Sequence, residues 1–210
     1  MLSRYSFGIG DRFAHQGRAQ LRAFLKAKEK GIAITPVWNK SYREHEIIGS
    51  VSAENRRNAD NAVQELGWTE GYFVDADHIS LKNVDFFMDT CDFFTIDVAD
   101  YIGKKAESAA TKKFVERAKK YVGKLTLPVI GTKLDVTEPI LQEIADKYLF
   151  AAEASAKVYQ HIHEKKKECV VEISMDETDQ PQTPVELFFI LMMLSDQRIP
   201  VATIAPKFSG

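Results

Sequence analysis

The stretch GYFVDADH, residues 71–78, carries the pattern that decides the fold of this chain. Its apolar, aromatic-rich start predicts a strand over 71–77, and its end carries two aspartates and a histidine. Similar short apolar runs recur along the sequence and are separated by amphipathic segments. They predict further strands over 4–13, 32–38, 92–98, 169–175 and 200–206.

The segments between these runs have helical spacing. The run from Thr183 to Glu186 is a capping box with proline at the first helical position, so a helix is expected to begin there. We predict helices over 16–30, 52–66, 84–89, 137–167 and 183–196, and a basic helix after 104. Segment 104–168 is thus expected to be a helical excursion between the fourth and fifth strands. Strands that alternate with helices predict an α/β fold with a parallel sheet.

A doubly wound sheet and a (β/α) TIM-type barrel both fit this alternation. Polar residues collect where nearly every strand ends, and a barrel builds its active site at that face, so the barrel is favoured. Only about six of the eight strands that a barrel needs are present. We therefore expect residues 1–210 to form a single, incomplete barrel domain, truncated at its C-terminus. Its open edge would suit a homo-oligomer.

Composition narrows the classes of function. The chain has 210 residues, 28 Lys+Arg against 30 Asp+Glu, and a formal net charge of −2, so a nucleic-acid partner is not expected. Neither a membrane-spanning run nor a signal peptide is evident, and a cytoplasmic location is expected. Cys91 and Cys169 are far apart in sequence and are interpreted as buried free thiols in a reducing compartment.

The end of the 71–77 strand is the strongest candidate site. Asp75 and Asp77 share a strand face because side chains alternate along a strand. His78 is expected to begin the following loop and to turn inward. Carboxylates with an imidazole suit a divalent metal such as Mn²⁺, Zn²⁺, Ni²⁺ or Co²⁺, and a carboxylate beside the metal can act as a general base.

A second group of polar residues ends the 169–175 strand. Glu172 and Asp176 share a face there. The apolar neighbours of Glu172 predict deep burial, which would raise the pKa of this carboxyl and suit a general acid. An ion pair to a buried Lys or Arg is the alternative.

Two cations are candidates for binding an anionic substrate group. Arg12 follows the glycine turn Gly8-Ile-Gly10, which is neither a dinucleotide fingerprint nor a Walker loop. Lys207 follows the last predicted strand. His45 is interpreted as a surface histidine.

Taken together, several motifs resemble the tagaturonate epimerase family over nearly the whole chain. They occur in the order SFGIGDR (6–12), DADH (75–78), FTID (94–97), MDET (175–178) and APKFSG (205–210). The resemblance implies a metal-dependent epimerase that interconverts D-tagaturonate and D-fructuronate. Family members continue beyond residue 210 and carry a further metal-binding histidine on a later strand. The segment 101–168 shows no motif that aligns with the family.

By the same resemblance, His78 is a metal ligand, Asp77 the proton acceptor and Glu172 the proton donor, while Asp75 and Asp176 line the site. The two sugar acids differ one carbon beyond the carbon α to the ketone, so simple enolisation does not interconvert them. Retro-aldol cleavage followed by re-closure of the same bond can interconvert them. Arg12 or Lys207 would hold the substrate carboxylate during this reaction. The alternatives are a non-catalytic partial barrel and a metal-dependent aldolase or ketose isomerase on the same site.

Overall fold

The computed structural model describes residues 2–127, 131 and 133–208. By its internal contacts the chain divides into two compact units. The first unit comprises Met1–Ile96 and Val158–Glu172, and the second comprises Asp97–Lys157 and Ile173–Gly210.

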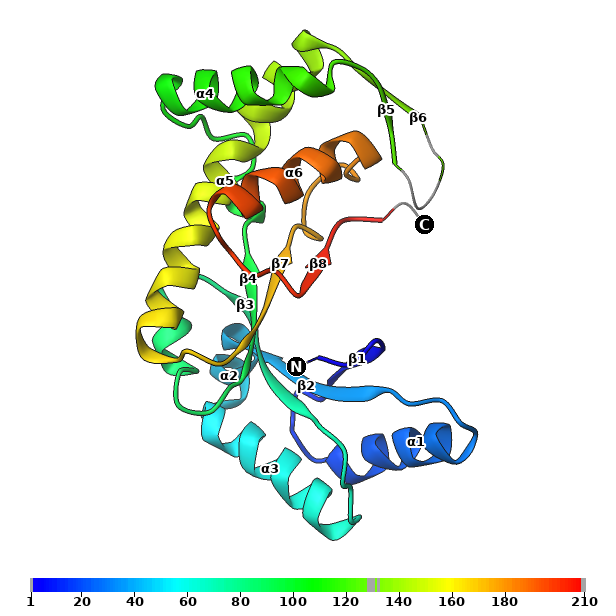
Figure 1. The fold of residues 1–210 in the computed structure, drawn as a ribbon. Coiled ribbons are helices and arrows are strands. Elements are labelled where there is room, and N and C mark those ends of the chain that lie inside the picture. Colours follow the sequence, from blue (N-terminus) through cyan, green and yellow to red (C-terminus); the bar gives the residue numbers. More distant parts are fainter. Residues whose placement is uncertain (1, 128–130, 132, 209–210) are drawn as a thin grey trace. The chain divides into compact units, whose positions relative to one another are not determined.

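In the part of the chain that the structure describes, the main sheet has six strands, as the sequence predicts. Its order is β1-β2-β3-β4-β7-β8, which follows the chain and never reverses as a doubly wound sheet does (Figure 1). The strands are β1 (Ser6–Gly10), β2 (Thr35–Ser41), β3 (Phe73–Ile79), β4 (Phe93–Asp97), β7 (Val170–Ser174) and β8 (Thr203–Ala205). β1 to β4 pair in parallel. β7 also runs parallel to β4, because Val170 donates to the Asp92 carbonyl and Val98 donates to the Ser174 carbonyl.

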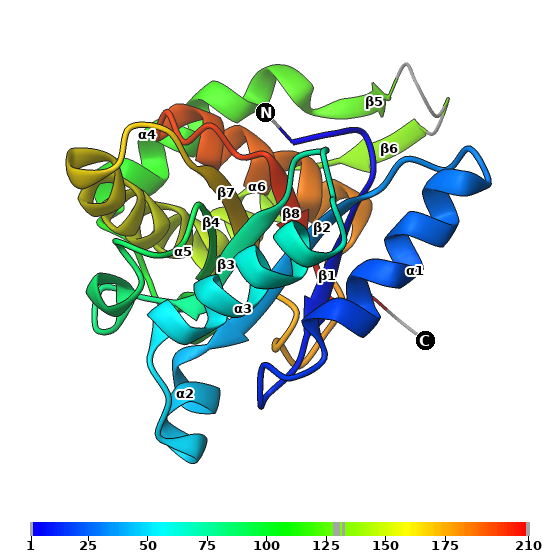
Figure 2. The same ribbon diagram turned by 90° about the horizontal axis from the view of Figure 1, so that it is seen from below.

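In the first unit, helices cover one face of the sheet and an apolar cluster lies on the other. The helices are α1 (Gly17–Glu29), α2 (Tyr42–Ile48) and α3 (Ser52–Glu65), with a 3-10 turn η1 (Val84–Phe86). α1 and α3 contact each other and β2 (Figures 1 and 2). Leu21 and Phe24 anchor α1 because its apolar stripe is buried. Val37, Phe93 and Val170 form the buried cluster on the remaining face.

α2 was not predicted from the sequence. It is only seven residues long, and its termini carry the signal that defines it. Ser41 and Glu44 form a reciprocal capping box, and Gly49 closes the helix in the left-handed conformation at φ 67°. The caps make a short helix possible directly after a strand.

Within its described residues, the second unit contains two α-helices, most of a third, and an antiparallel pair of strands. Its elements are η2 (Ala99–Tyr101), α4 (Ser108–Ala118), η3 (Lys119–Tyr121), α5 (Glu138–Lys165), whose last turns belong to the first unit, and α6 (Pro184–Asp196). The capping box of Thr183 and Glu186 is confirmed at the start of α6. The expected helical excursion over 104–168 also contains the antiparallel pair β5 (Gly123–Thr126) and β6 (Lys133–Val136), visible in Figure 2. Pro128, which the sequence placed in an irregular stretch, lies outside the described residues.

Two further expectations concern helices and cysteines. Among the described residues, no helix is both long enough and apolar enough to cross a lipid bilayer. Cys91 and Cys169 are free thiols, as expected. Cys91 is buried, but the expected burial of Cys169 is wrong, because Cys169 is only partly buried.

Candidate functional site

The main candidate site lies at the carboxyl end of β3, where the strand bulges. Ala76 pairs with Phe94 and Ile79 with Ile96, so two residues, Asp77 and His78, face the single residue Thr95 of β4. His78 takes the left-handed conformation at φ 50°, which is rare outside glycine and typical of functional positions. It therefore lies inside the strand as a bulge residue, and the prediction that it begins the following loop is wrong.

The bulge joins Asp77 to His78. In a regular strand, neighbouring side chains point to opposite faces, but here His78 Nδ1 lies 2.9 Å from Asp77 Oδ1. The side chains of Asp77 and His78 are 19% and 27% exposed, so the pair is sheltered yet reachable. An imidazole that donates one ring N–H to a carboxylate has its tautomer and ring plane fixed.

Asp75 lies deeper in the same unit and links two strands. Its side chain is buried, and its two oxygens accept hydrogen bonds from the Thr95 backbone N–H at 3.2 Å and the Thr95 hydroxyl at 2.9 Å. Burial raises the pKa of Asp75 well above its ordinary value, and the negative charges of Asp77 and Glu172 raise it further. Asp75 is thus a buried carboxyl, bound to Thr95, whose pKa is raised by burial and by the nearby negative charges.

The hydroxyl of Thr95 is expected to contribute measurably to stability. Thr95→Val removes the bond to Asp75 Oδ2 and keeps the side-chain shape, so the free energy of unfolding should fall by about 1–3 kcal/mol. Since this hydrogen bond lowers the pKa of Asp75, its loss should also raise that pKa further. Urea denaturation at neutral pH measures the first effect. Thr95→Ser, which keeps the hydroxyl, should stay closer to wild type, and equal losses in both variants would contradict the assignment.

Glu172 belongs to the same carboxylate group. It lies on β7, two strands from β3 in the sheet order, and its charge acts on Asp75. The deep burial that the sequence predicted is wrong, because Glu172 is only partly buried between the buried Val171 and Ile173. In the first unit, Asp77 therefore lies beside His78, and the charges of Asp77 and Glu172 both act on Asp75.

The remaining predicted site residues have other immediate contacts. Arg12, with a half-exposed side chain, has its Nε 3.6 Å from Glu44 Oε1 in the first unit. Asp176, in the second unit, accepts a hydrogen bond of 2.5 Å from the Ser174 hydroxyl. Lys207, also in the second unit, donates its backbone N–H to Gln182 Oε1 at 2.8 Å.

A buried polar cluster in the first unit was missed at the sequence level. Lys40 and His45 are 1% and 2% exposed, so the prediction of a surface histidine is wrong. Both bind the Ser50 hydroxyl, Lys40 Nζ at 3.0 Å and His45 Nδ1 at 2.8 Å. Burial lowers the pKa of Lys40, and burial together with the charge of Lys40 lowers the pKa of His45 to about 4. The signal that could have located this cluster was the α2 capping box.

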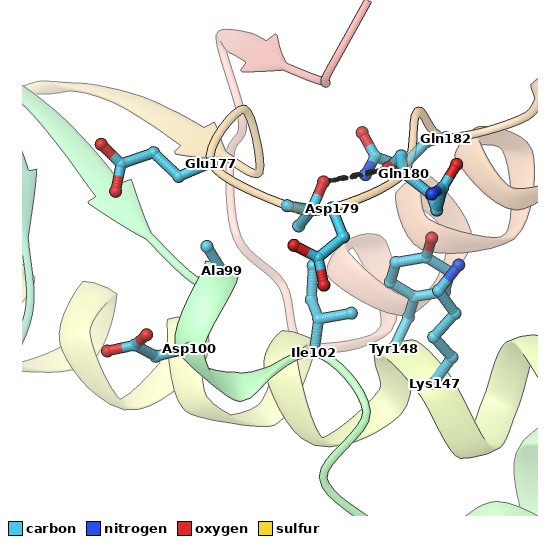
Figure 3. Close-up of a pocket in the computed structure, with 10 residues that line it drawn as sticks. Ala99, Asp100, Ile102, Lys147, Tyr148, Glu177, Asp179, Gln180 and Gln182 are labelled. Carbon is cyan, nitrogen blue, oxygen red and sulfur yellow. Dashed lines mark hydrogen bonds between the residues drawn. The ribbon is translucent and has the colours of Figure 1, made fainter.

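A pocket of about 380 Å³ lies in the second unit, beside the loops that follow β4 and β7. Lys147 and Tyr148 project into it from α5 (Figure 3), and both bind Glu186 Oε1 at 2.8 Å. Burial raises the pKa of Tyr148 to about 12. The residues that line this pocket are Ala99, Asp100, Ile102, Lys147, Tyr148, Glu177, Thr178, Asp179, Gln180 and Gln182.

Fold and site together define an α/β protein with carboxylates and an imidazole at the carboxyl ends of parallel strands. Comparison with known proteins makes the assignment specific. A family model described as tagaturonate epimerase matches residues 1–210, so the chain belongs to the tagaturonate epimerase family. This confirms the resemblance found in the sequence motifs.

Individual relatives agree with that assignment. The chain is 29% identical to the tagaturonate/fructuronate epimerase of Thermotoga maritima, over 99% of this chain and 44% of the relative. A glycerol-complexed structure of the fructuronate-tagaturonate epimerase of Cohnella laeviribosi matches at TM-score 0.81 and 24% identity, covering 98% of this chain and 44% of that one. The native structure of that epimerase matches at TM-score 0.74 and 22% identity. The chain thus spans less than half the length of these relatives.

Proposed function

We propose that this chain carries the general acid and base of an epimerase that interconverts D-tagaturonate and D-fructuronate. The observation that carries the proposal is the grouping of Asp75, Asp77, His78 and Glu172 in one unit, with a strained bulge that joins Asp77 to His78. Membership of the tagaturonate epimerase family supports the choice of substrate.

A divalent metal is proposed as the cofactor, because imidazole nitrogen and carboxylate oxygen are donor types that such metals bind. His78 donates through Nδ1 to Asp77, the arrangement that leaves Nε2 as the nitrogen suited to a metal. Within residues 2–127, 131 and 133–208, no group of three or more His, Cys, Asp or Glu side chains converges on one point. His78 would therefore be one ligand of Mn²⁺, Ni²⁺, Co²⁺ or Zn²⁺. When bound, the metal would supply charge stabilisation at the substrate's ketone and hydroxyl oxygens.

The residues of the chain divide the proton transfers between them. We assign Asp77 to take the proton from the hydroxyl on the carbon that is epimerised. The bond from that carbon to its neighbour α to the ketone then breaks, and the electron pair passes to the α carbon. After the aldehyde fragment turns its other face, the bond re-forms and Glu172 returns a proton to the oxygen. Asp75 is assigned to line the site beside Asp77, and Arg12 or Lys207 is the candidate to bind the substrate carboxylate.

The architecture of the site is proposed to be part of a (β/α) TIM-type barrel. The unbroken, parallel order of the strands and the position of the polar residues at their carboxyl ends support this. Association of copies through β1 is proposed as well, because this edge strand is mostly exposed and Phe7 on it is 62% exposed.

Proton NMR of D-tagaturonate incubated with the chain tests the proposed function. The chain is first stripped with a chelator and then supplied with Mn²⁺, Ni²⁺, Co²⁺ or Zn²⁺. We expect D-fructuronate to appear only after a metal is added. No conversion with any of the four metals would instead favour a non-catalytic partial barrel.

The same assay separates the retro-aldol route from its alternatives. Labelled aldehyde fragments added to the reaction should enter the product. Solvent deuterium found on the epimerised carbon would contradict this route, because cleavage and re-closure leave the hydrogen on that carbon in place.

A further inference from the structure

The side chain of Asn39 lies on the same face of the sheet as the carboxyl of Asp75. In the register of the parallel ladder, Asn39 of β2 lies between Gly10 of β1 and Asp75 of β3 (Figure 2 shows the three strands side by side). Residues paired in this way present their side chains on one face, and side chains alternate along each strand. Asn39 therefore shares the face of Val37, which belongs to the apolar cluster opposite the helices.

The amide of Asn39 is not satisfied by the protein. Its Oδ1 is buried, and no donor in the described segments of the chain lies within hydrogen-bond distance of it. Buried polar groups in folded proteins are nearly always hydrogen-bonded, because an unpaired group costs free energy. The neighbouring Asp75 follows this rule, since both of its oxygens accept hydrogen bonds from Thr95. An exception beside it is expected where a side chain serves function rather than stability.

Gly10 makes room for this amide. A Cβ built on Gly10 would lie 3.2 Å from Asn39 Oδ1, so an alanine there would displace the amide by a few tenths of an ångström. Gly10 does not take a positive φ, so space rather than backbone conformation favours glycine at this position. A Cβ built on Gly8, two residues earlier in β1, would meet nothing within 4 Å. The two glycines therefore differ in whether they contact Asn39.

A sugar hydroxyl is the ligand group that suits the Asn39 amide. The amide has an oxygen that accepts and an N–H₂ group that donates, and a hydroxyl can match both. The ketone and the carboxylate of a sugar acid can only accept, so neither can pair with the amide oxygen. Asn39 and Asp77 are diagonal neighbours on adjacent strands, with Cα atoms roughly 8 Å apart. A six-carbon sugar acid is long enough to contact both.

We propose that Asn39 is a substrate-binding residue whose amide forms a hydrogen bond with a hydroxyl of the sugar acid held at Asp77. This inference rests on the proposed function. All the residues that carry it, Gly10, Asn39, Asp75 and Asp77, belong to the first unit. The unpaired amide costs stability in the free protein and gains its partner when the substrate binds.

Asn39→Leu separates this role from a structural one. Leucine replaces the unpaired amide by an apolar group of similar shape, so the urea midpoint should equal or exceed that of wild type. D-Tagaturonate should nevertheless bind about 10- to 100-fold more weakly, because the substrate hydroxyl loses its partner. Asn83→Leu is the control for stability. It removes an oxygen that accepts the Ser80 N–H at 2.8 Å, so it should lower the urea midpoint.

A titration with D-tagaturonate in the presence of Zn²⁺, followed by ¹H–¹⁵N NMR, measures binding and observes the amide directly. The side-chain N–H₂ signals of Asn39 are identified by their absence from Asn39→Leu. They should shift as the substrate is added to wild type, because the hydrogen bond forms at this group.

The two glycines provide a matched pair of variants. Gly10→Ala should weaken binding about 3- to 10-fold, because it displaces the Asn39 amide. Gly8→Ala adds the same methyl group in open space and should bind like wild type. When combined with Asn39→Ala, Gly10→Ala should cause no further loss, because both changes act through the same hydrogen bond.

The outcomes distinguish this inference from the proposed function. If wild type binds D-tagaturonate and Asn39→Leu binds it as tightly, the inference is overturned. Asn39 N–H₂ signals that stay in place during the titration also overturn it, as does a urea midpoint of Asn39→Leu as low as that of Asn83→Leu. Equal binding by Gly8→Ala and Gly10→Ala would contradict it too. If wild type does not bind D-tagaturonate, the proposed function fails and the inference fails with it.

Discussion

Asp77→Asn is expected to slow the conversion of D-tagaturonate by about 10²- to 10⁴-fold, the usual contribution of a general base. The amide oxygen can still accept the hydrogen bond from His78 Nδ1, so the bulge and the ring orientation should persist. What is lost is the ability to take a proton. The initial rate of D-fructuronate formation, followed by NMR at saturating substrate and metal, measures the effect.

A second readout shows whether the substitution stays local. The charge of Asp77 raises the pKa of Asp75, so its removal should lower that pKa, which an NMR titration of the Asp75 carboxyl detects. Asp89→Asn, the same change at an exposed carboxylate of the same unit, should leave both the rate and the pKa of Asp75 unchanged. An Asp77→Asn rate within about threefold of wild type would remove Asp77 from the role of proton acceptor.

The second large effect concerns acid stability and arises from His45. Burial and the charge of Lys40 lower the pKa of His45 from 6.5 to about 4. The unfolded chain therefore binds a proton more readily than the folded one between these values, and stability must fall as the pH falls. The contribution of His45 is complete above pH 6.5 and is lost as the pH approaches 4. It amounts to about 3 kcal/mol.

Urea denaturation at pH 7, 5.5 and 4 compares wild type with His45→Gln. The glutamine keeps a partner for the Ser50 hydroxyl but does not titrate. Between pH 7 and pH 4, the free energy of unfolding of the variant should therefore fall by about 3 kcal/mol less than that of wild type. The carboxylates that titrate in this range are the same in both proteins, so their effects on stability cancel when the two proteins are compared. His15→Gln, at an exposed histidine, should lose as much as wild type. If His45→Gln loses as much as wild type too, His45 is not the acid-labile group.

Local signals determined most of the fold. The apolar runs at 71–77, 92–98 and 169–175 became β3, β4 and β7, with ends shifted by one or two residues. The capping box at Thr183 placed the start of α6 correctly, because caps are made by residues close in sequence. The β5–β6 pair escaped prediction because its four-residue strands have little periodicity of their own and are stabilised by each other.

The candidate site was predicted in composition but not in geometry. Residue types and motif order identified Asp75, Asp77, His78 and Glu172 and pointed to the family that the comparisons confirm. The bulge at His78 was not visible in the sequence, because it arises from the pairing register between β3 and β4. The partial exposure of Glu172 and the burial of His45 likewise depend on which elements pack over them.

The sequence by itself therefore determined the alternation of strands and helices, the helix caps and the set of chemically active side chains. Each of these depends on residues within a few positions of one another. Tertiary structure alone decided that Asp75 is buried against Thr95, that Gln182 binds the backbone of Lys207, and that Lys40 and His45 share Ser50. Burial and hydrogen-bond partners depend on segments distant in sequence, and the shifted pKa values follow from them.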